Sequence, residues 1–337
     1  MTWTRTGALL AILATLVAAG CGGSEDTAGG SAAGSGGDGS SRLSLVAYST
    51  PEVVYGEIIP AFRKTAAGKD VGFKTSFGAS GEQSRAVEGG LDADIVSFSI
   101  EPDVERLVES GLVAEDWKRA TPTKGLVSKS IVSFIVRKGN PKRIRSWDDL
   151  VKPGVKVITP NPFTSGAAKW NLLGAYAHGG LAYVSKLIKD HVSVQPKSGR
   201  EALQTFTGGE GDVLLSYEYE ATTAIKKGEK SIELVRPSDS TVEIEINIAR
   251  TDKASAAARR FIDYVLGPEG QEKFVEWGYR PVDPETAAAT KSQFPDPPEV
   301  KTIADLGGWS KVNDELFDPE QGSIAKIEEE AGVSTAQ

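Results

Sequence analysis

Three turns of the sequence combine serine and glycine where a strand is expected to end and a helix to begin. They are Gly78-Ala79-Ser80-Gly81, Thr164-Ser165-Gly166-Ala167 and Ser198-Gly199-Arg200. The first backbone N–H groups of a helix have no acceptor within the helix, and the helix dipole makes this end positive. Small residues let a ligand approach these N–H groups closely. Together the three turns predict an oxyanion site that needs no lysine or arginine in contact with the anion.

The middle turn follows a short apolar segment and precedes a long apolar helical pattern. Residues 155–158 are expected to form the end of a buried strand, and Pro160-Asn161-Pro162 is expected to form a turn. Thr164 and Ser165 are then the candidate N-cap residues, because serine and threonine are preferred at that position. We therefore expect the N-terminus of this helix to be the centre of the anion site.

The rest of the chain repeats units of strand, turn and helix. Strands are expected at residues 43–48, 71–75, 93–98, 130–137, 192–194, 211–217, 232–235 and 242–248. Helices are expected at residues 53–62, 82–88, 103–110, 200–206, 218–227 and 254–266. Such repeats are typical of α/β proteins with largely parallel sheets, in which ligands bind at the carboxyl ends of the strands.

Composition excludes several classes of function. The 337 residues are 39% hydrophobic and 25% charged, which is enough for a globular core of about two domains. Lys and Arg number 38 against 46 Asp and Glu, so the net charge of -8 argues against a nucleic-acid partner. The single Cys excludes an internal disulfide framework, and two His leave little for a metal site. We expect neither a metal nor a cofactor.

The N-terminal residues are predicted to be a targeting and anchoring segment. Residues 1–20 form the predicted signal peptide, because Arg5 precedes an apolar run that is too short to span a membrane. The run ends at Ala18-Ala19-Gly20-Cys21, which resembles the lipobox of bacterial lipoproteins, where the cysteine is lipidated. Residues 21–42 are rich in Gly and Ser and are expected to be a flexible tether. The alternative is a plain secretory signal with an incidental cysteine.

Longer stretches resemble the periplasmic sulfate-binding proteins of ABC importers. The resemblance covers roughly residues 43–310 and is most specific in RKGNPKRIRSWDDLVKPGVKVITPNPFTSGAAKWN, at residues 137–171. Further matching segments are SFGASGEQ, ADIVSF, GEGDVLLSYEYEA, GPEGQEKF and GYRP.

This resemblance implies a two-lobe α/β fold of the type II periplasmic-binding-protein class. Each lobe would be a mostly parallel sheet flanked by helices, with the ligand in the cleft between the lobes. The lobes are expected at residues 43–122 plus 240–295 and at residues 123–239, and residues 296–330 would form helices that pack on them. The protein would be a monomer outside the cytoplasm, anchored to the membrane by Cys21, that delivers its anion to an ABC permease.

The resemblance also implies the ligands. Family members hold a dehydrated sulfate with backbone N–H groups, serine hydroxyls and an indole N–H. Carried over by position, the ligand residues are Ser49, Ser80, Ser165, Gly166, Ala167, Gly199 and Tyr217. Thr164 and Arg200 are expected to lie beside the ligands without touching the anion.

Three of these positions depart from the family pattern. Ser49 replaces an aspartate of the best-known members, Tyr217 replaces the tryptophan, and Ala167 replaces the second glycine of a pair. Sulfate needs only donors, whereas hydrogen phosphate also needs an acceptor, and a hydroxyl can serve as either. Sulfate or thiosulfate is therefore expected, with molybdate, tungstate and phosphate as alternatives.

Two other classes of function are weaker alternatives. A hydrolase would use Ser80 as nucleophile with His178 or His191, but Gly-Ala-Ser-Gly-Glu does not match the G-x-S-x-G elbow. His178 precedes Gly179-Gly180 and is expected to be a solvated residue at the end of a helix. A purely structural lipoprotein is the second alternative.

Overall fold

A computed structural model describes residues 41–335 of the chain. The predicted signal peptide, Cys21 and nearly all of the tether lie outside the described residues, so the structure does not test them. Among the described helices, none combines the length and hydrophobicity that a membrane crossing requires.

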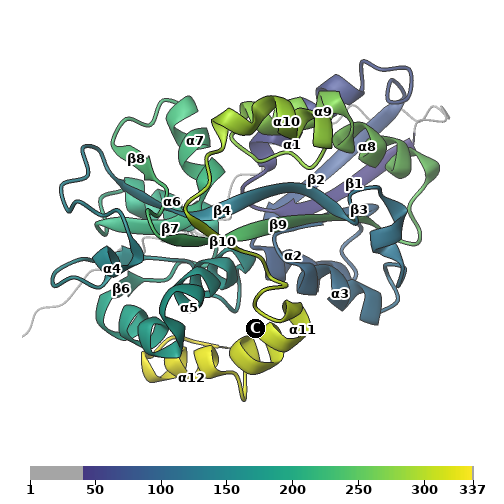
Figure 1. Ribbon diagram of the computed structural model, residues 1–337. Helices are drawn as coiled ribbons and strands as arrows, with labels where there is room; N and C mark the ends of the chain where they lie inside the picture. The colour runs from purple at the N-terminus through teal and green to yellow at the C-terminus, as the bar shows by residue number, and fades with distance from the viewer. Residues whose placement is uncertain (1–40, 336–337) are drawn as a thin grey trace, which may run out of the picture. The chain divides into compact units, whose positions relative to one another are not determined.

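Helices and strands alternate through most of the described chain (Figure 1). The strands are β1 (Ser41–Tyr48), β2 (Val71–Gly78), β3 (Ile95–Phe98), β4 (Leu126–Arg137), β5 (Val157–Ile158), β6 (Val192–Val194), β7 (Val213–Tyr217), β8 (Ile232–Val235), β9 (Ser240–Arg250) and β10 (Glu299–Lys301). The helices are α1 (Glu52–Phe62), α2 (Ser80–Glu88), α3 (Glu101–Glu109), α4 (Trp147–Leu150), α5 (Gly166–Lys186), α6 (Gly199–Thr207), α7 (Glu218–Lys226), α8 (Ala256–Leu266), α9 (Pro268–Glu276), α10 (Pro284–Thr290), α11 (Gly308–Val312) and α12 (Ser323–Glu330).

Two long strands connect the two lobes of this fold. The hydrogen-bonded order is β2-β1-β3-β9-β4-β7-β5-β6, so β9 and β4 stand in the middle. The first lobe contains β1–β3 with α1–α3, and the second contains β5–β7 with α4–α7 (Figure 1). β4 pairs with β9 over its first half and with β7 and β8 over its second half, so this strand belongs to both lobes. This arrangement is the predicted two-lobe α/β architecture.

Strands pair in parallel within each lobe, whereas the pairs that β4 and β9 make between and beside the lobes are antiparallel. β1 pairs with β2 and β3 in parallel, and β5 pairs with β6 and β7 in parallel, as the repeated strand–helix units predict. The pairs that β4 and β9 make with β3, β7, β8 and each other are antiparallel. Parallel pairs place their carboxyl ends on one edge, and both lobes therefore direct those ends toward the helix starts described below.

Some element limits differ from the predicted ones. α2 begins at Ser80 rather than Glu82, and Ala79 is its N-cap residue. The expectation that His178 lies at a helix end is confirmed, because α5 consists of two helical segments separated at Gly180, where φ is 66° and ψ is -167°. The ring of His178 is only 19% exposed, so it is less solvated than expected. His178 Nε2 lies 3.1 Å from Asp148 Oδ1, and the ring stacks on Trp147. Glycine adopts a positive φ without steric cost, which allows the break between the two helical segments at Gly180.

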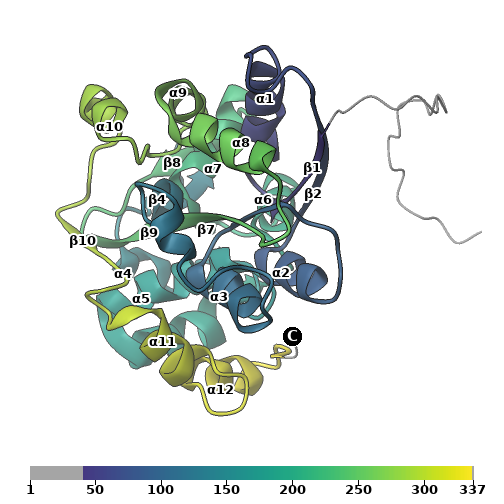
Figure 2. The same cartoon turned by 90° about the vertical axis from the view of Figure 1, so that its right-hand side faces the viewer.

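The C-terminal segment packs against the long helix α5 (Figure 2). Trp309 of α11 contacts Trp170 of α5 edge to face, with 4.8 Å between ring centroids. Lys169 Nζ donates to Asn313 Oδ1 at 2.7 Å, and α12 contacts α5 as well. The buried start of α5 is therefore supported by the C-terminal helices on the side away from the sheet.

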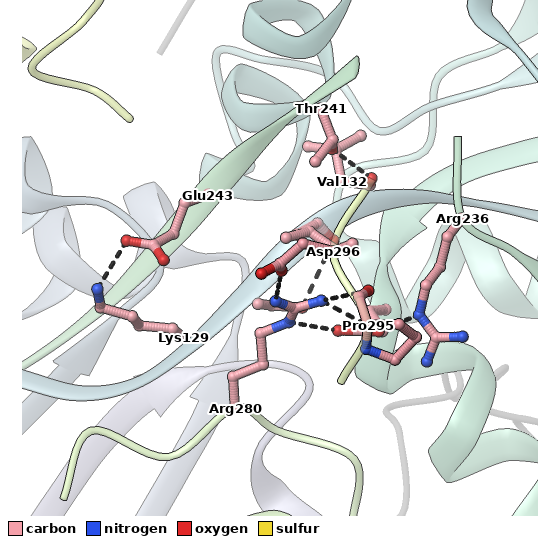
Figure 3. Close-up of polar contacts among 11 residues, drawn as sticks. Lys129, Val132, Arg236, Thr241, Glu243, Arg280, Pro295 and Asp296 are labelled. Atoms are coloured by element: carbon pink, nitrogen blue, oxygen red, sulfur yellow. Dashed lines mark hydrogen bonds and ion pairs between the residues drawn. The ribbon is translucent and has the colours of Figure 1, made fainter. Parts of the chain in front are cut away.

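An ion cluster joins the start of α7 to the segment that follows α9. Glu218 has a side chain only 1% exposed, and its carboxylate accepts hydrogen bonds from Arg236 and from Arg280 Nε, the latter at 2.7 Å. Arg280 also contacts Asp296 and the carbonyl of Pro295 (Figure 3). Figure 3 also shows the pair Lys129–Glu243, which links β4 to β9 at 2.6 Å and is part-exposed.

The ion cluster predicts a stability difference between two glutamate variants. Glu218→Gln should lower the free energy of unfolding by about 3 kcal/mol, because a charge removed from a buried pair leaves its partner uncompensated. Glu243→Gln is the matched control and should cost less than about 1 kcal/mol, because its pair is part-exposed and screened. Urea denaturation of both variants measures these values, and equal losses would contradict the role given to Glu218.

Candidate functional site

Hydrogen bonds within and between the lobes bring the predicted turns together. Gly81 N donates to the carbonyl of Thr164 at 3.3 Å, which joins the start of α2 to the start of α5. Thr164 Oγ1 donates to the carbonyl of Lys197 at 2.7 Å, which joins α5 to the turn before α6. Arg200 of α6 donates to the carbonyl of Ser49 at the end of β1. The end of β1 and the starts of α2, α5 and α6 therefore surround one place between the lobes.

Backbone N–H groups at these helix starts are free to bind a ligand. Ser80 is the first residue of α2, Gly166 and Ala167 are the first two residues of α5, and Gly199 is the first residue of α6. Their N–H groups have no acceptor within the described residues, and all of these residues are buried. Four donors at the positive ends of three helices form an arrangement that suits an anion.

The predicted side-chain donors differ in whether their hydroxyls are already bonded to protein groups. Ser165 is the N-cap residue of α5, but its side chain does not cap the helix, so the buried hydroxyl is left for another partner. Ser49 is buried as well. Ser80 Oγ instead donates to Asp103 Oδ2 at 2.5 Å and accepts from Ser99 N at 3.1 Å. Its proton is thus committed to Asp103, and Ser80 offers a ligand mainly its backbone N–H.

Tyr217 ends β7 with its ring fully buried. Its hydroxyl has no hydrogen-bond partner of good geometry among the described residues. Burial raises the pKa of this hydroxyl well above its ordinary value, and the neighbouring Ser99 hydroxyl lowers it in part. Tyr217 therefore stays protonated at neutral pH and has a proton to donate.

Two cationic residues beside the site are held by protein acceptors. Arg200 reaches across the lobes to the Ser49 carbonyl and to Glu52 Oε2, the latter at 2.6 Å. Lys169 is buried beneath the first turn of α5 and bonds to Asn313, and burial lowers its pKa to about 8. Both cations are therefore bonded to protein groups that lie beside the helix starts.

Sequence reasoning missed two buried acids beside the site. Asp103 binds the Ser80 hydroxyl, and burial raises its pKa. Glu220 accepts a hydrogen bond from Ser216, and burial raises its pKa to about 7. Its carboxylate faces α6 so closely that a Cβ added at Gly199 would lie 3.1 Å from Glu220 Oε1. Neither acid belongs to a short motif, so only its position in the first turn of a helix could have indicated its role.

The histidines lie away from these serines. His178 contacts Asp148, and His191 Nδ1 lies 3.1 Å from the carbonyl of Val155. Among the described residues, neither histidine bonds to a serine of the candidate site, and no group of His, Cys, Asp and Glu could hold a metal ion.

The known proteins that this chain resembles are solute-binding proteins. The family model described as bacterial extracellular solute-binding protein matches residues 43–280. The sulfate-binding protein of Synechococcus elongatus is 36% identical over 341 residues, with 94% of each protein covered. The thiosulfate-binding protein of Pseudomonas aeruginosa is 34% identical, with 81% of this chain and 88% of that protein covered.

A solved structure agrees with the fold. The structure of the sulfate-binding protein SubI from Mycobacterium tuberculosis H37Rv superimposes with a TM-score of 0.79 at 45% identity. The match covers 82% of this chain and 100% of that one. Together with the crossing strands β4 and β9, this match confirms the type II two-lobe fold.

Proposed function

The chain belongs to the family of bacterial extracellular solute-binding proteins, and we propose that it captures sulfate or thiosulfate and delivers it to an ABC importer. The observation that carries this proposal is the group of unpaired backbone N–H donors at the starts of α2, α5 and α6. Relatives named as sulfate- and thiosulfate-binding proteins support the choice of anion. The protein acts as a binding protein without catalysis or a cofactor.

The bound anion is held by hydrogen bonds rather than by paired charges. We assign the donors to the backbone N–H groups of Ser80, Gly166, Ala167 and Gly199 and to the hydroxyls of Ser49, Ser165 and Tyr217. Thr164 and Arg200 stand beside these residues and connect the lobes, Thr164 through its carbonyl and Arg200 through its guanidinium. With a net charge of -8, the field of the whole chain opposes an anion, so affinity depends on short-range bonds in a dehydrated site.

The lobes close on the anion through the crossing strands. We assign residues 43–122 plus 240–295 to the first lobe, residues 123–239 to the second and residues 296–330 to the C-terminal helical segment. Contacts such as Gly81–Thr164 and Arg200–Ser49 belong to the closed arrangement, because their partners lie on different lobes. β4 and β9 follow directly after the two crossovers between these segments and pair with each other, so we assign the hinge to them.

The first prediction for this function concerns the start of α5. Ser165→Ala should weaken sulfate binding about tenfold to a hundredfold, because a hydrogen bond to a charged group contributes roughly 1.5–3 kcal/mol. Gly166→Pro should weaken binding more, because proline removes a donor N–H. Isothermal calorimetry at two chloride concentrations measures both effects, and little change with chloride is expected because buried bonds are poorly screened.

The same titrations decide among the alternative anions and functions. Molybdate, tungstate or phosphate bound more tightly than sulfate and thiosulfate would assign the site to that anion. Affinity that falls steeply with chloride, together with normal binding by the Ser165 variant, would place the site elsewhere. Turnover of an ester that the variants abolish would favour a hydrolase.

The second prediction concerns pH. An anion beside Glu220 favours the neutral carboxyl, so binding should take up a proton and affinity should fall as pH rises through about 7. Sulfate keeps its two charges over pH 5.5–7.5, so the change arises from the protein. Glu220→Gln should remove most of the dependence of sulfate affinity on pH. In the wild type, the affinity can change by up to about tenfold for each unit by which the bound anion raises the pKa of Glu220.

Glu328 provides a matched control for Glu220. Burial also raises its pKa to about 7, but it bonds to Gln195 from α12 and not to the candidate site. Glu328→Gln should therefore retain the pH dependence of sulfate affinity. A Glu220→Gln variant whose affinity falls with pH as in the wild type would contradict the role given to this acid.

The third prediction concerns the anchor. We propose that Cys21 is lipidated and holds the protein at the outer face of the cytoplasmic membrane, with the binding lobes on a Gly/Ser-rich tether. Cys21→Ser should release the protein from the membrane fraction while sulfate affinity stays unchanged. Full retention of the variant in washed membranes would contradict a lipid anchor. Size measurement of the released protein tests whether it is a monomer.

A further inference from the structure

Ser99 occupies a fixed position at the centre of the candidate site. It directly follows β3, is 1% exposed, and uses both of its backbone groups. Its N–H donates to Ser80 Oγ at 3.1 Å, and its carbonyl accepts from Trp170 Nε1 at 2.7 Å. Trp170 belongs to α5 of the second lobe, so Ser99 is held from both sides of the site.

The side chain of Ser99 makes no hydrogen bond of good geometry to the rest of the described chain, although its hydroxyl is fully enclosed. A buried hydroxyl without a partner is rare and costly, so such a group points to a ligand or to a functional role.

The neighbours of this hydroxyl are the anion donors. A Cβ added at Gly166 would overlap Ser99 Oγ, so the hydroxyl lies directly against the first residue of α5. The hydroxyl of Tyr217 is near enough for Ser99 to lower its pKa. The Ser80 hydroxyl is close as well, but its proton is given to Asp103. Unlike the Ser80 hydroxyl, the Ser99 hydroxyl is therefore not committed to a carboxylate.

We propose that the Ser99 hydroxyl is a direct ligand of the oxyanion and donates a hydrogen bond to it between Gly166 and Tyr217. This inference rests on the proposed function and adds a ligand that the serine–glycine turns do not contain. The turn before α2 then contributes a backbone N–H, and the end of β3 contributes the side-chain donor. Gly166 is required at the start of α5 partly because a larger residue would displace this hydroxyl.

The test compares two buried serines by calorimetry with sulfate. Ser99→Ala should weaken binding about tenfold or more, as expected for a lost bond to a charged group. Ser133→Ala is the matched control, because Ser133 in β4 is also fully buried with an unpartnered hydroxyl and is paired with Ser216 rather than with a helix start. Its affinity should stay within about twofold of the wild type.

A second variant, with a measurement of stability, distinguishes the loss of a hydrogen bond to the anion from unfolding of the protein. Ser99→Cys keeps the size of the side chain but replaces the hydroxyl by a weak donor, so it should lose affinity as well. The melting temperature of each variant without sulfate shows whether it is folded. Wild-type affinity in folded Ser99→Ala or Ser99→Cys protein would overturn the inference, as would an equal loss in Ser133→Ala.

Binding by the wild-type protein distinguishes a failure of the proposed function from a failure of the Ser99 inference. Wild-type protein that binds none of sulfate, thiosulfate, molybdate, tungstate and phosphate would overturn both the function and this inference. Wild-type protein that binds sulfate, with folded Ser99 variants that bind equally well, would overturn the inference alone.

Discussion

The site depends on keeping several backbone N–H groups dry, unpaired and pointed at one place. A buried polar group without a partner is costly, so a protein that builds such a cluster must hold it by other contacts. Here the starts of α2, α5 and α6 are connected by Gly81–Thr164 and Thr164–Lys197, both of which use groups just beside the free donors. The bonds that fix the cluster thus leave the donors themselves available.

This requirement explains why the site is shared between two lobes. A single lobe would hold only part of the donor set, and open lobes would expose the donors to water. The long strands β4 and β9 pair with each other where the two lobes meet, while α5 is buried at its start and supported by Trp309 and Asn313 from the C-terminal segment. The bond from Trp170 to the Ser99 carbonyl then links α5 directly to the end of β3. Closure and donor geometry are therefore one structural property.

Much of this architecture could be predicted from the sequence. Strand and helix periodicity locates most elements, and serine–glycine turns mark the helix starts because small and capping residues have local physical reasons to be there. Ser99 and Glu220 could not be predicted in this way, since each acts as a single residue whose role depends on tertiary contacts with Gly166 and Gly199. The helix break after His178 could be predicted, because Gly179-Gly180 is typical of a helix end and Gly180 has a positive φ.

The two buried acids show how a negatively charged protein can prepare a site for an anion. Asp103 accepts a hydrogen bond from Ser80 and stands next to the start of α2, and Glu220 accepts one from Ser216 and stands next to the start of α6. Burial raises the pKa of both acids, which weakens the repulsion that an anion would otherwise meet. Lys169 and Arg200 bond to protein acceptors. Charges of both signs therefore shape the surrounding network, and in the proposed function the number and direction of the protein's hydrogen-bond donors select the anion.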